Sequence, residues 1–251
     1  MKIINENINV LVLAASKTIS SNQRSHYPSC LTEIKNKSIL EHIAENIKNI
    51  KNKEVMFAFL ESEIKKFHLK KISSLILPNS SCTKVPEETK GSGCTALLSA
   101  CKLDQDHELL ILSANELVNV DLNISLKSFR SQNYDAGTII FESVHPRYSF
   151  VNIEDGLVVQ AEQRKPISSN ATAGVFWFKK TSYFVEAMQK TIIKKITTDN
   201  NYFIAPSFNQ LILDGKLIGV HKINNRDYIP LKNEKQTNDI NLNIRGFDES
   251  T

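Results

Sequence analysis

The sequence predicts an α/β fold in which a mostly parallel sheet is flanked by helices. Two observations lead to this prediction. Short apolar runs of strand length alternate with helix-length amphipathic segments through the first half of the chain. Several of these runs are continuously apolar, which is typical of strands buried on both faces of a parallel sheet. With 251 residues, the chain is long enough to bury a sizeable core.

The first half supplies the alternating elements. Residues 8–14 predict the first buried strand, and Ser38 and Glu41 have the spacing of a capping box that opens the first helix. The elements expected next are, in order, a strand over 54–60, a helix over 61–69, a strand over 72–77, a helix over 91–103, a strand over 108–114 and a helix over 123–133. Ligands of such sheets bind at the carboxyl ends of strands, so residues 14–31 and 113–121 should border the site.

The second half is richer in predicted strands. Asp155 and Gly156 form a hairpin-turn signal within residues 147–163. The other expected elements are strands over 135–144 and 171–178, helices over 182–196 and 206–216, and a last strand over 217–223. No linker separates the halves. We therefore expect a single domain over residues 1–238, followed by a polar C-terminal tail over 239–251.

Composition limits the classes of function. Thirty-one basic against 27 acidic residues give a net charge of +4 that is spread along the chain, which argues against a nucleic-acid partner. No apolar run approaches the roughly 18 residues of a membrane span, and the polar N-terminus argues against a secretory signal. Four cysteines without paired metal spacing are typical of reduced thiols. These features predict a cytoplasmic location.

Five passages carry a resemblance to a known family. They are, in chain order, "LVLAAS" (11–16), "YPSCLTEIKNKSILEHIAENI" (27–47), "KGSGCTALLSAC" (90–101), "LLILSANELVNVD" (109–121) and "AEQRKPISSNATAGVFWF" (161–178). Together the passages resemble the sugar nucleotidyltransferases, over nearly the whole chain. The resemblance implies a GT-A or Rossmann-like mixed sheet, with residues 144–170 as a β-excursion over the sugar side. It also implies an activity, which is the joining of a nucleoside triphosphate to a sugar 1-phosphate or a related phosphate.

The resemblance implies a nucleotide-binding loop after the first strand. The turn "AASKTISSNQR" contains no glycine, so a backbone cradle for phosphate is weakened here. Lys17 and Arg24 are the catalytic cations that we expect in this loop, and the alternative is a plain surface loop with two incidental charges. The helix opened by Gly91 and Gly93 should offer amides to a base or phosphate. The expected nucleotide-binding residues are therefore Leu13, Ala14, Ala15, Ser16, Gly91 and Gly93.

The resemblance also implies Mg²⁺ (or Mn²⁺) as cofactor. Family members place an aspartate where this chain has Asn115, and an amide oxygen binds a hard cation less firmly than a carboxylate does. If the strand continues through Asn115, Glu116 is expected to point to the opposite face, because side chains alternate along a strand. Asp121 is the carboxylate that we assign beside Asn115 to metal binding and catalysis. The alternative for Asp121 is an N-cap of the following helix.

The pocket for the acceptor, the sugar phosphate, is the best preserved part of the resemblance, and we call it the acceptor side. We expect Glu162 to accept hydrogen bonds from sugar hydroxyls, and Lys165 or Arg164 to bind the acceptor's phosphate. Gly174 allows close approach of the backbone. The remaining expected substrate-binding residues are Arg147, Tyr148, Asn170 and Thr172. For Arg147 and Tyr148 the alternative is a plain strand end beside a proline turn.

Three functions are compatible with these features. The leading one is a nucleotidyltransferase for capsule or other surface polysaccharide, because "HPRYSFV", "ISSNATAGVFWF" and "DYIPLKNEKQ" resemble a branch from such gene clusters. The second is a catalytically inactive regulatory or binding subunit. The third is a glycosyltransferase of the GT-A fold. The expected partners are a nucleoside triphosphate and a small phosphate, and homo-oligomerisation stays open.

Overall fold

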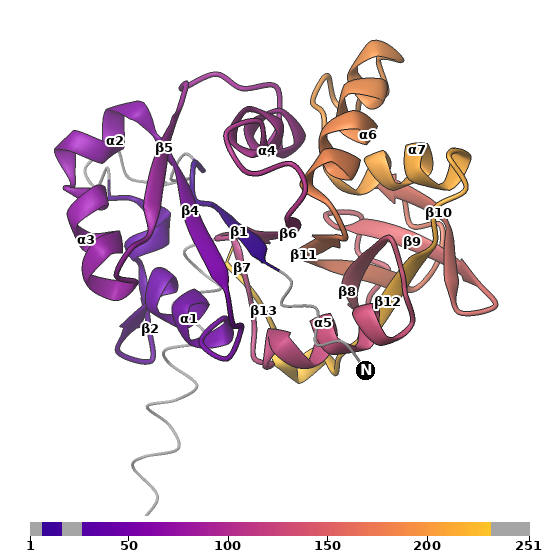
Figure 1. Ribbon diagram of the computed structural model, residues 1–251, viewed down its shortest axis with the longest axis horizontal. Coiled ribbons are helices and arrows are strands. Elements are labelled where there is room, and N and C mark those ends of the chain that lie inside the picture. The colour runs from indigo at the N-terminus through magenta and orange to yellow at the C-terminus, as the bar shows by residue number, and fades with distance from the viewer. Residues whose placement is uncertain (1–6, 17–26, 232–251) are drawn as a thin grey trace, which may run out of the picture.

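The computed structural model describes residues 7–16 and 27–231, and its centre is a nine-stranded mixed sheet (Figure 1). The order along the sheet is β10-β9-β11-β6-β1-β4-β5, and β8 lies between β11 and β12. The strands are β1 (Ile8–Leu13), β4 (Lys53–Leu60), β5 (Ser81–Val85), β6 (Glu108–Ser113), β8 (Ala136–Glu142), β9 (Ser149–Glu154), β10 (Leu157–Gln163), β11 (Asn170–Phe178) and β12 (Ile218–Lys222). Lys17, Arg24 and the expected tail over 239–251 lie outside the described residues.

Parallel pairing is concentrated in the N-terminal half, as the alternation of strands and helices predicted. β1 pairs in parallel with β4 and β6, and β4 pairs in parallel with β5. From β11 onward the sheet is mostly antiparallel, and β9 and β10 form the expected β-hairpin excursion. The predicted fold class is confirmed.

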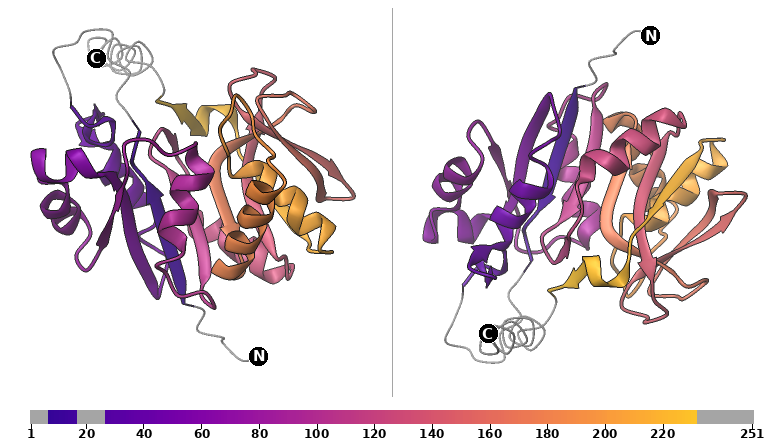
Figure 2. Two further views of the ribbon diagram at one scale, coloured as in Figure 1. Left: turned by 90° about the horizontal axis from the view of Figure 1, so that it is seen from above. Right: turned by 90° about the horizontal axis from the view of Figure 1, so that it is seen from below.

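Helices cover both faces of the sheet, and the alternation of side chains along the strands explains why. Val10 and Val12 pack into a core beneath α1, α3 and α5, whereas Leu11 and Leu13 pack into a second core beneath α4, α6 and α7. In Figure 2, α4, α6 and α7 lie at the front of the view from above, and α5 lies at the front of the view from below. The helices are α1 (Ile39–Asn46), α2 (Glu61–Lys66), α3 (Leu69–Ile76), α4 (Ser92–Ala100), α5 (Leu122–Ser131), α6 (Thr181–Ile193) and α7 (Phe208–Leu213).

Two local signals are found where the sequence predicted them. The Ser38 hydroxyl caps the backbone N–H of Glu41, and the Glu41 carboxylate accepts from the backbone N–H of Ser38, which completes the capping box. Asp155 and Gly156 both have positive φ, 49° and 80°, as a two-residue turn between β9 and β10 requires.

One predicted strand is wrong. Residues 72–77 belong to helix α3 and its end, because Leu69, Ile72 and Ile76 follow helical spacing and pack on the core beneath α1. The strand of this region is β5, whose sequence "SCTKV" has no continuous apolar run. As an edge strand, β5 buries Thr83 and Val85 and exposes Ser81 and Lys84.

Short elements complete the fold around the carboxyl ends of the central strands. β7 (Glu116–Val118) pairs with β13 (Tyr228–Pro230), and β2 (Glu33–Ile34) pairs with β3 (Lys37–Ser38). Three 3-10 turns are η1 (Ser29–Leu31), η2 (Ala205–Ser207) and η3 (Asn225–Asp227). Within the described ranges, no helix is long and apolar enough to cross a membrane.

Candidate active site

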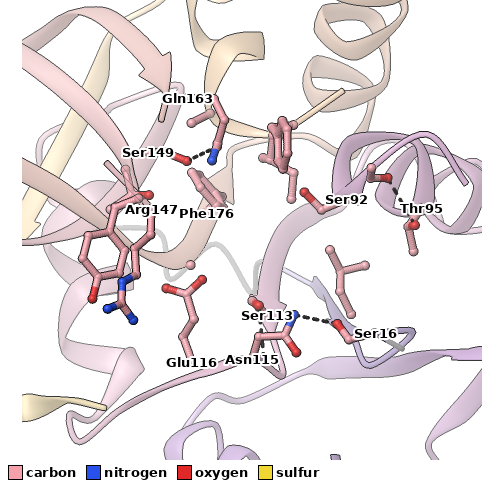
Figure 3. A pocket seen from close by; sticks show the side chains of 18 of the residues that line it. Ser16, Ser92, Thr95, Ser113, Asn115, Glu116, Arg147, Ser149, Gln163 and Phe176 are labelled. Carbon is pink, nitrogen blue, oxygen red and sulfur yellow. Dashed lines mark hydrogen bonds between the residues drawn. The ribbon is translucent and has the colours of Figure 1, made fainter. Parts of the chain in front are cut away.

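A cavity of about 380 Å³ opens at the carboxyl ends of β1 and β6 (Figure 3). One side is formed by the start of α4, where Ser92 and Thr95 lie, and the other by the hairpin β9–β10 together with β11. Asn115 and Glu116 lie between the two sides, directly after β6. This is the edge of the sheet that the sequence predicted for the site.

The end of β1 supplies part of the wall. Leu13, Ala15 and Ser16 line the cavity, whereas Ala14 is buried and its N–H donates to the carbonyl of Ala58 on β4, at 3.0 Å. Ala14 therefore continues the sheet and supports the wall from behind. Among the described residues that follow β1, Ser16 is the one whose polar side chain lines the cavity.

The start of α4 is lined by hydroxyl groups. Thr89 and Thr95 share a hydrogen bond of 2.8 Å between their hydroxyls, and Gly91 and Ser92 lie beside them. Gly91 has φ +90°, and a Cβ there would lie 2.3 Å from the Tyr202 carbonyl oxygen, so only glycine fits.

Gly93 lies behind this wall. Its N–H donates to the same Tyr202 carbonyl oxygen at 2.9 Å, and Met188 packs against it. The Gly93 amide, which was expected to contact a nucleotide, is therefore already hydrogen-bonded within the fold. Gly93 is absent from the described residues that line the cavity.

Asn115 connects three chain segments. Its side-chain Nδ2 donates to the Ser16 hydroxyl at 2.6 Å, and its carbonyl oxygen accepts from the N–H of Leu231 at 3.0 Å. Its own N–H donates to the Ser113 hydroxyl at 3.2 Å. The amide oxygen Oδ1 is the atom of this side chain that a cation would use.

Glu116 faces the same cavity as Asn115, so the condition for the opposite direction, a strand that continues through Asn115, is not met. The reason is that β6 ends at Ser113 and a turn at 114–115 interrupts the strand alternation before β7 begins. The Glu116 carboxylate accepts a hydrogen bond of 2.7 Å from the Tyr228 hydroxyl. Gly174 leaves room for it, since a Cβ there would lie 3.0 Å from the carboxylate carbon.

Asp121 is placed elsewhere. One carboxylate oxygen accepts from the N–H of Asn123 at 3.0 Å and caps α5, and the other accepts from the Asn49 amide at 2.9 Å. Asp121 is absent from the lining of the cavity, so the two residues assigned to a metal are not brought together. The N-cap alternative describes what the structure shows.

The acceptor side is polar and carries an arginine. The Ser149 hydroxyl donates to Gln163 Oε1 at 2.5 Å across the hairpin, and Thr172 lies beside them on β11. The Arg147 guanidinium lies 5.5 Å from the centre of the Tyr148 ring, within cation–π range. Ser149 and Gln163 are not among the site residues expected from the sequence, and the pairing of β9 with β10 places them directly opposite each other.

Three other residues expected on the acceptor side lie outside the cavity. Alternation along β10 points Gln163 inward, so Glu162 faces away and accepts from the Gln160 amide at 3.2 Å. Lys165 is exposed on the loop that follows. Asn170 begins β11 opposite Glu142, away from the lining residues.

Arg164 is the cation of this loop that lines the cavity. It has φ +58°, and its guanidinium forms an ion pair with Asp199. It lies 5.9 Å from the centre of the Phe203 ring. Of the two cations considered for an acceptor phosphate, Arg164 therefore has the suitable position.

Comparison with solved structures identifies the fold. A nucleoside-diphosphate-sugar pyrophosphorylase from Vibrio cholerae RC9 superposes with a TM-score of 0.77 at 17% identity, over 92% of this chain and 98% of that one. The chain has the fold of the sugar nucleotidyltransferases. A candidate glucose-1-phosphate thymidylyltransferase from Bacillus anthracis, in complex with a sucrose, gives a TM-score of 0.73 at 13% identity, over 95% of each chain.

Sequence comparison points to the same family. The Bifunctional protein GlmU of Buchnera aphidicola subsp. Schizaphis graminum is 29% identical over 129 residues, which are 51% of this chain. The match spans about a quarter, 26%, of the length of that curated relative. No protein-family model matches the chain. The resemblance read from the five passages is confirmed at the level of the fold.

A divalent cation is the cofactor that this fold implies, and the cavity offers few ligands for one. The described residues contain no cluster of three or more histidine, cysteine, aspartate or glutamate side chains suited to a metal. Asn115 and Glu116 supply one amide oxygen and one carboxylate at the cavity. Mg²⁺ is commonly held by one or two carboxylates together with substrate phosphates and water, so this pair fits an ion that arrives with a nucleotide.

Proposed function

We propose that the protein joins a nucleoside triphosphate to a sugar phosphate or a related small phosphate. The observation that carries the proposal is the cavity at the ends of β1 and β6, with Asn115 and Glu116 at its centre and Arg147 on its far side. Its volume of about 380 Å³ lies within the usual range of ligand pockets, roughly 300–1,000 Å³. Its place matches the rule that α/β sheets bind ligands beyond the carboxyl ends of their strands.

The reaction would be a direct phosphoryl substitution. A phosphate oxygen of the acceptor attacks the α-phosphorus of the triphosphate, and the bond to the bridging oxygen breaks to release pyrophosphate. Such reactions are catalysed mostly by positioning and by neutralisation of charge. A bound divalent cation would neutralise charge on the phosphates, and Glu116 with Asn115 would hold it.

Each wall has a role in this proposal. Ser16, Ser92 and Thr95 offer hydroxyls to the nucleotide on the side of α4. On the other side, the arginines Arg147 and Arg164 attract the acceptor's phosphate. Guanidinium groups suit this task because they remain charged and can donate two parallel hydrogen bonds.

We further propose surface-polysaccharide synthesis as the setting, on the resemblance of "HPRYSFV" and "DYIPLKNEKQ" to that branch of the family. A binding subunit without turnover is the second candidate function. Asn115 favours this candidate, because it replaces the family's metal-binding aspartate, and so does the turn without glycine after β1.

Calorimetry followed by a product assay separates these candidates. Each of ATP, CTP, GTP, UTP and dTTP is titrated with Mg²⁺, and pyrophosphate release is then followed with a panel of sugar phosphates and polyol phosphates. Arg147→Gln should weaken acceptor binding by about tenfold or more, the order expected for a charged hydrogen bond. The matched control Lys127→Gln removes one positive charge from the exposed surface of α5. Nucleotide binding without pyrophosphate release from any pair would support the binding subunit instead.

A further inference from the structure

Residues 227–231 hold the backbone that carries Asn115 and Glu116. In the pairing of β13 with β7, Pro230 lies opposite Glu116 and Tyr228 opposite Val118. Outside the strands, the N–H of Leu231 donates to the backbone carbonyl of Asn115. The N–H of Asn119 donates to the backbone carbonyl of Asp227 at 2.7 Å. Residues 227–231 therefore fix the path of 115–119 at both ends.

Tyr228 extends this attachment to a side chain. Its hydroxyl donates to Glu116 Oε2 at 2.7 Å, and the residue is 7% exposed. Its ring stacks on Phe141, with centroids 3.9 Å apart and planes inclined by 17°. Because the ring is confined by this contact, the hydroxyl holds the Glu116 carboxylate in one orientation.

The same ring also reaches the acceptor side. Tyr148 packs edge-on against Tyr228, with ring centroids 5.6 Å apart. Tyr148 in turn underlies the Arg147 guanidinium. One chain of contacts thus joins Glu116 to Arg147.

We propose that Tyr228 is a positioning residue that sets the Glu116 carboxylate toward a cation–nucleotide complex and braces the Tyr148 platform of Arg147. The inference rests on the proposed function, since it assigns the geometry of that site to a residue outside the cavity lining. Buried tyrosines also stabilise folds through their rings alone. The hydroxyl is therefore the group whose removal distinguishes positioning from packing.

A double-mutant cycle tests this role. The five triphosphates named above are titrated with Mn²⁺, and the tightest binder is used to compare Tyr228→Phe, Glu116→Gln and the double variant. We expect Tyr228→Phe to raise the Mn²⁺ concentration needed for half-maximal nucleotide binding about tenfold, the effect of one lost hydrogen bond to a charged group. In the Glu116→Gln background the same change should add less than about twofold, because the charged carboxylate that Tyr228 would position is gone.

The control is Tyr134→Phe, which removes a hydroxyl bonded to Gln132 on the surface and should leave the Mn²⁺ dependence unchanged. Should Tyr228→Phe fail to fold, Phe141→Leu removes the ring on which Tyr228 stacks and should shift the Mn²⁺ dependence in the same direction by a smaller factor. Equal, additive losses in both backgrounds would show that the Tyr228 hydroxyl does not act through Glu116, and would overturn the proposal. A wild-type protein that binds none of the five triphosphates would overturn the proposed function and this inference together. Wild-type binding with an unaffected Tyr228→Phe would overturn the inference alone.

Discussion

The side-chain amide of Asn115 donates to the hydroxyl of Ser16 at 2.6 Å, and this bond joins the end of β6 to the end of β1 across the floor of the cavity. An aspartate at position 115 would accept from Ser16 instead, so the contact itself is compatible with the family's residue. The substitution therefore alters the charge of the site more than its shape. Glu116 is the carboxylate that remains beside Asn115.

Restoring the carboxylate tests whether the cavity still admits a triphosphate. Asn115→Asp should strengthen Mg²⁺-dependent nucleotide binding about tenfold, since hard cations prefer charged oxygens. Isothermal titration with and without EDTA measures the effect. Asn119→Asp is the matched control, because it adds the same charge at an exposed position beyond the lining. An unchanged affinity in Asn115→Asp would mean that the side chain at position 115 does not contact the cation of the bound nucleotide.

Asp121 should matter for stability and not for binding. Asp121→Ala removes the cap of α5 and the contact with Asn49, which should lower the free energy of unfolding by about 1 kcal/mol, the usual value of an N-cap. Asp121→Asn retains an oxygen acceptor and should cost less. Urea unfolding gives the stability, and titration with a triphosphate gives the binding. A hundredfold loss of turnover in a folded Asp121→Asn variant would restore Asp121 to the catalytic site.

The sequence predicted the elements more reliably than the directions of side chains. Alternating apolar runs identified β1, β4 and β6, because strands buried on both faces need continuous apolar residues. The edge strand β5 lacks this signal, since its residues Ser81 and Lys84 face solvent and interrupt the apolar run. The direction of Glu116 depends on the two-residue turn after Ser113, and hydrophobic periodicity does not reveal such a turn. The attachment of Tyr228 is a contact 112 residues apart in the chain, which no local pattern reports.

Gly174 should be needed for the position of Glu116. It has φ +70°, and a Cβ there would lie 3.0 Å from the Glu116 carboxylate carbon. Gly174→Ala should therefore both strain the backbone and displace the carboxylate. Gly156→Ala supplies the matched control, because Gly156 has φ +80° and a Cβ added there would meet no atom within 4 Å. We expect both variants to lose about 1 kcal/mol of stability, and Gly174→Ala alone to weaken Mg²⁺-dependent nucleotide binding. Equal binding by both variants would contradict this role.

Cys30 should make the fold sensitive to alkaline pH. Burial, with the nearby Glu63 carboxylate, raises the pKa of its thiol from 9.0 to about 12. Above pH 9 the unfolded chain releases this proton while the folded chain keeps it, so the free energy of unfolding falls as pH rises from 9 to 12. The slope from this thiol is about 1.4 kcal/mol per pH unit, and below pH 9 its contribution is constant. Cys30→Ala should remove that part of the slope in urea unfolding, whereas Cys101→Ala, at an exposed thiol, should not.

Neighbouring residues on β10 give the sharpest test of the acceptor side. Gln163 is 8% exposed and faces the cavity beside Ser149, whereas Glu162 points away and contacts Gln160. If the acceptor binds along β9 and β10, Gln163→Ala removes an amide from its pocket and leaves the Ser149 hydroxyl without its partner. The loss should be about 1–3 kcal/mol of binding free energy, or roughly tenfold and more in affinity. Glu162→Ala should leave acceptor affinity within about twofold, because surface changes away from a site usually have small effects. Calorimetry with the sugar phosphate that supports pyrophosphate release compares the two variants. The nucleotide affinity of both variants should stay at the wild-type value. The opposite order of acceptor affinities, with Glu162→Ala the weaker binder, would show that the acceptor lies on the outer face of the hairpin.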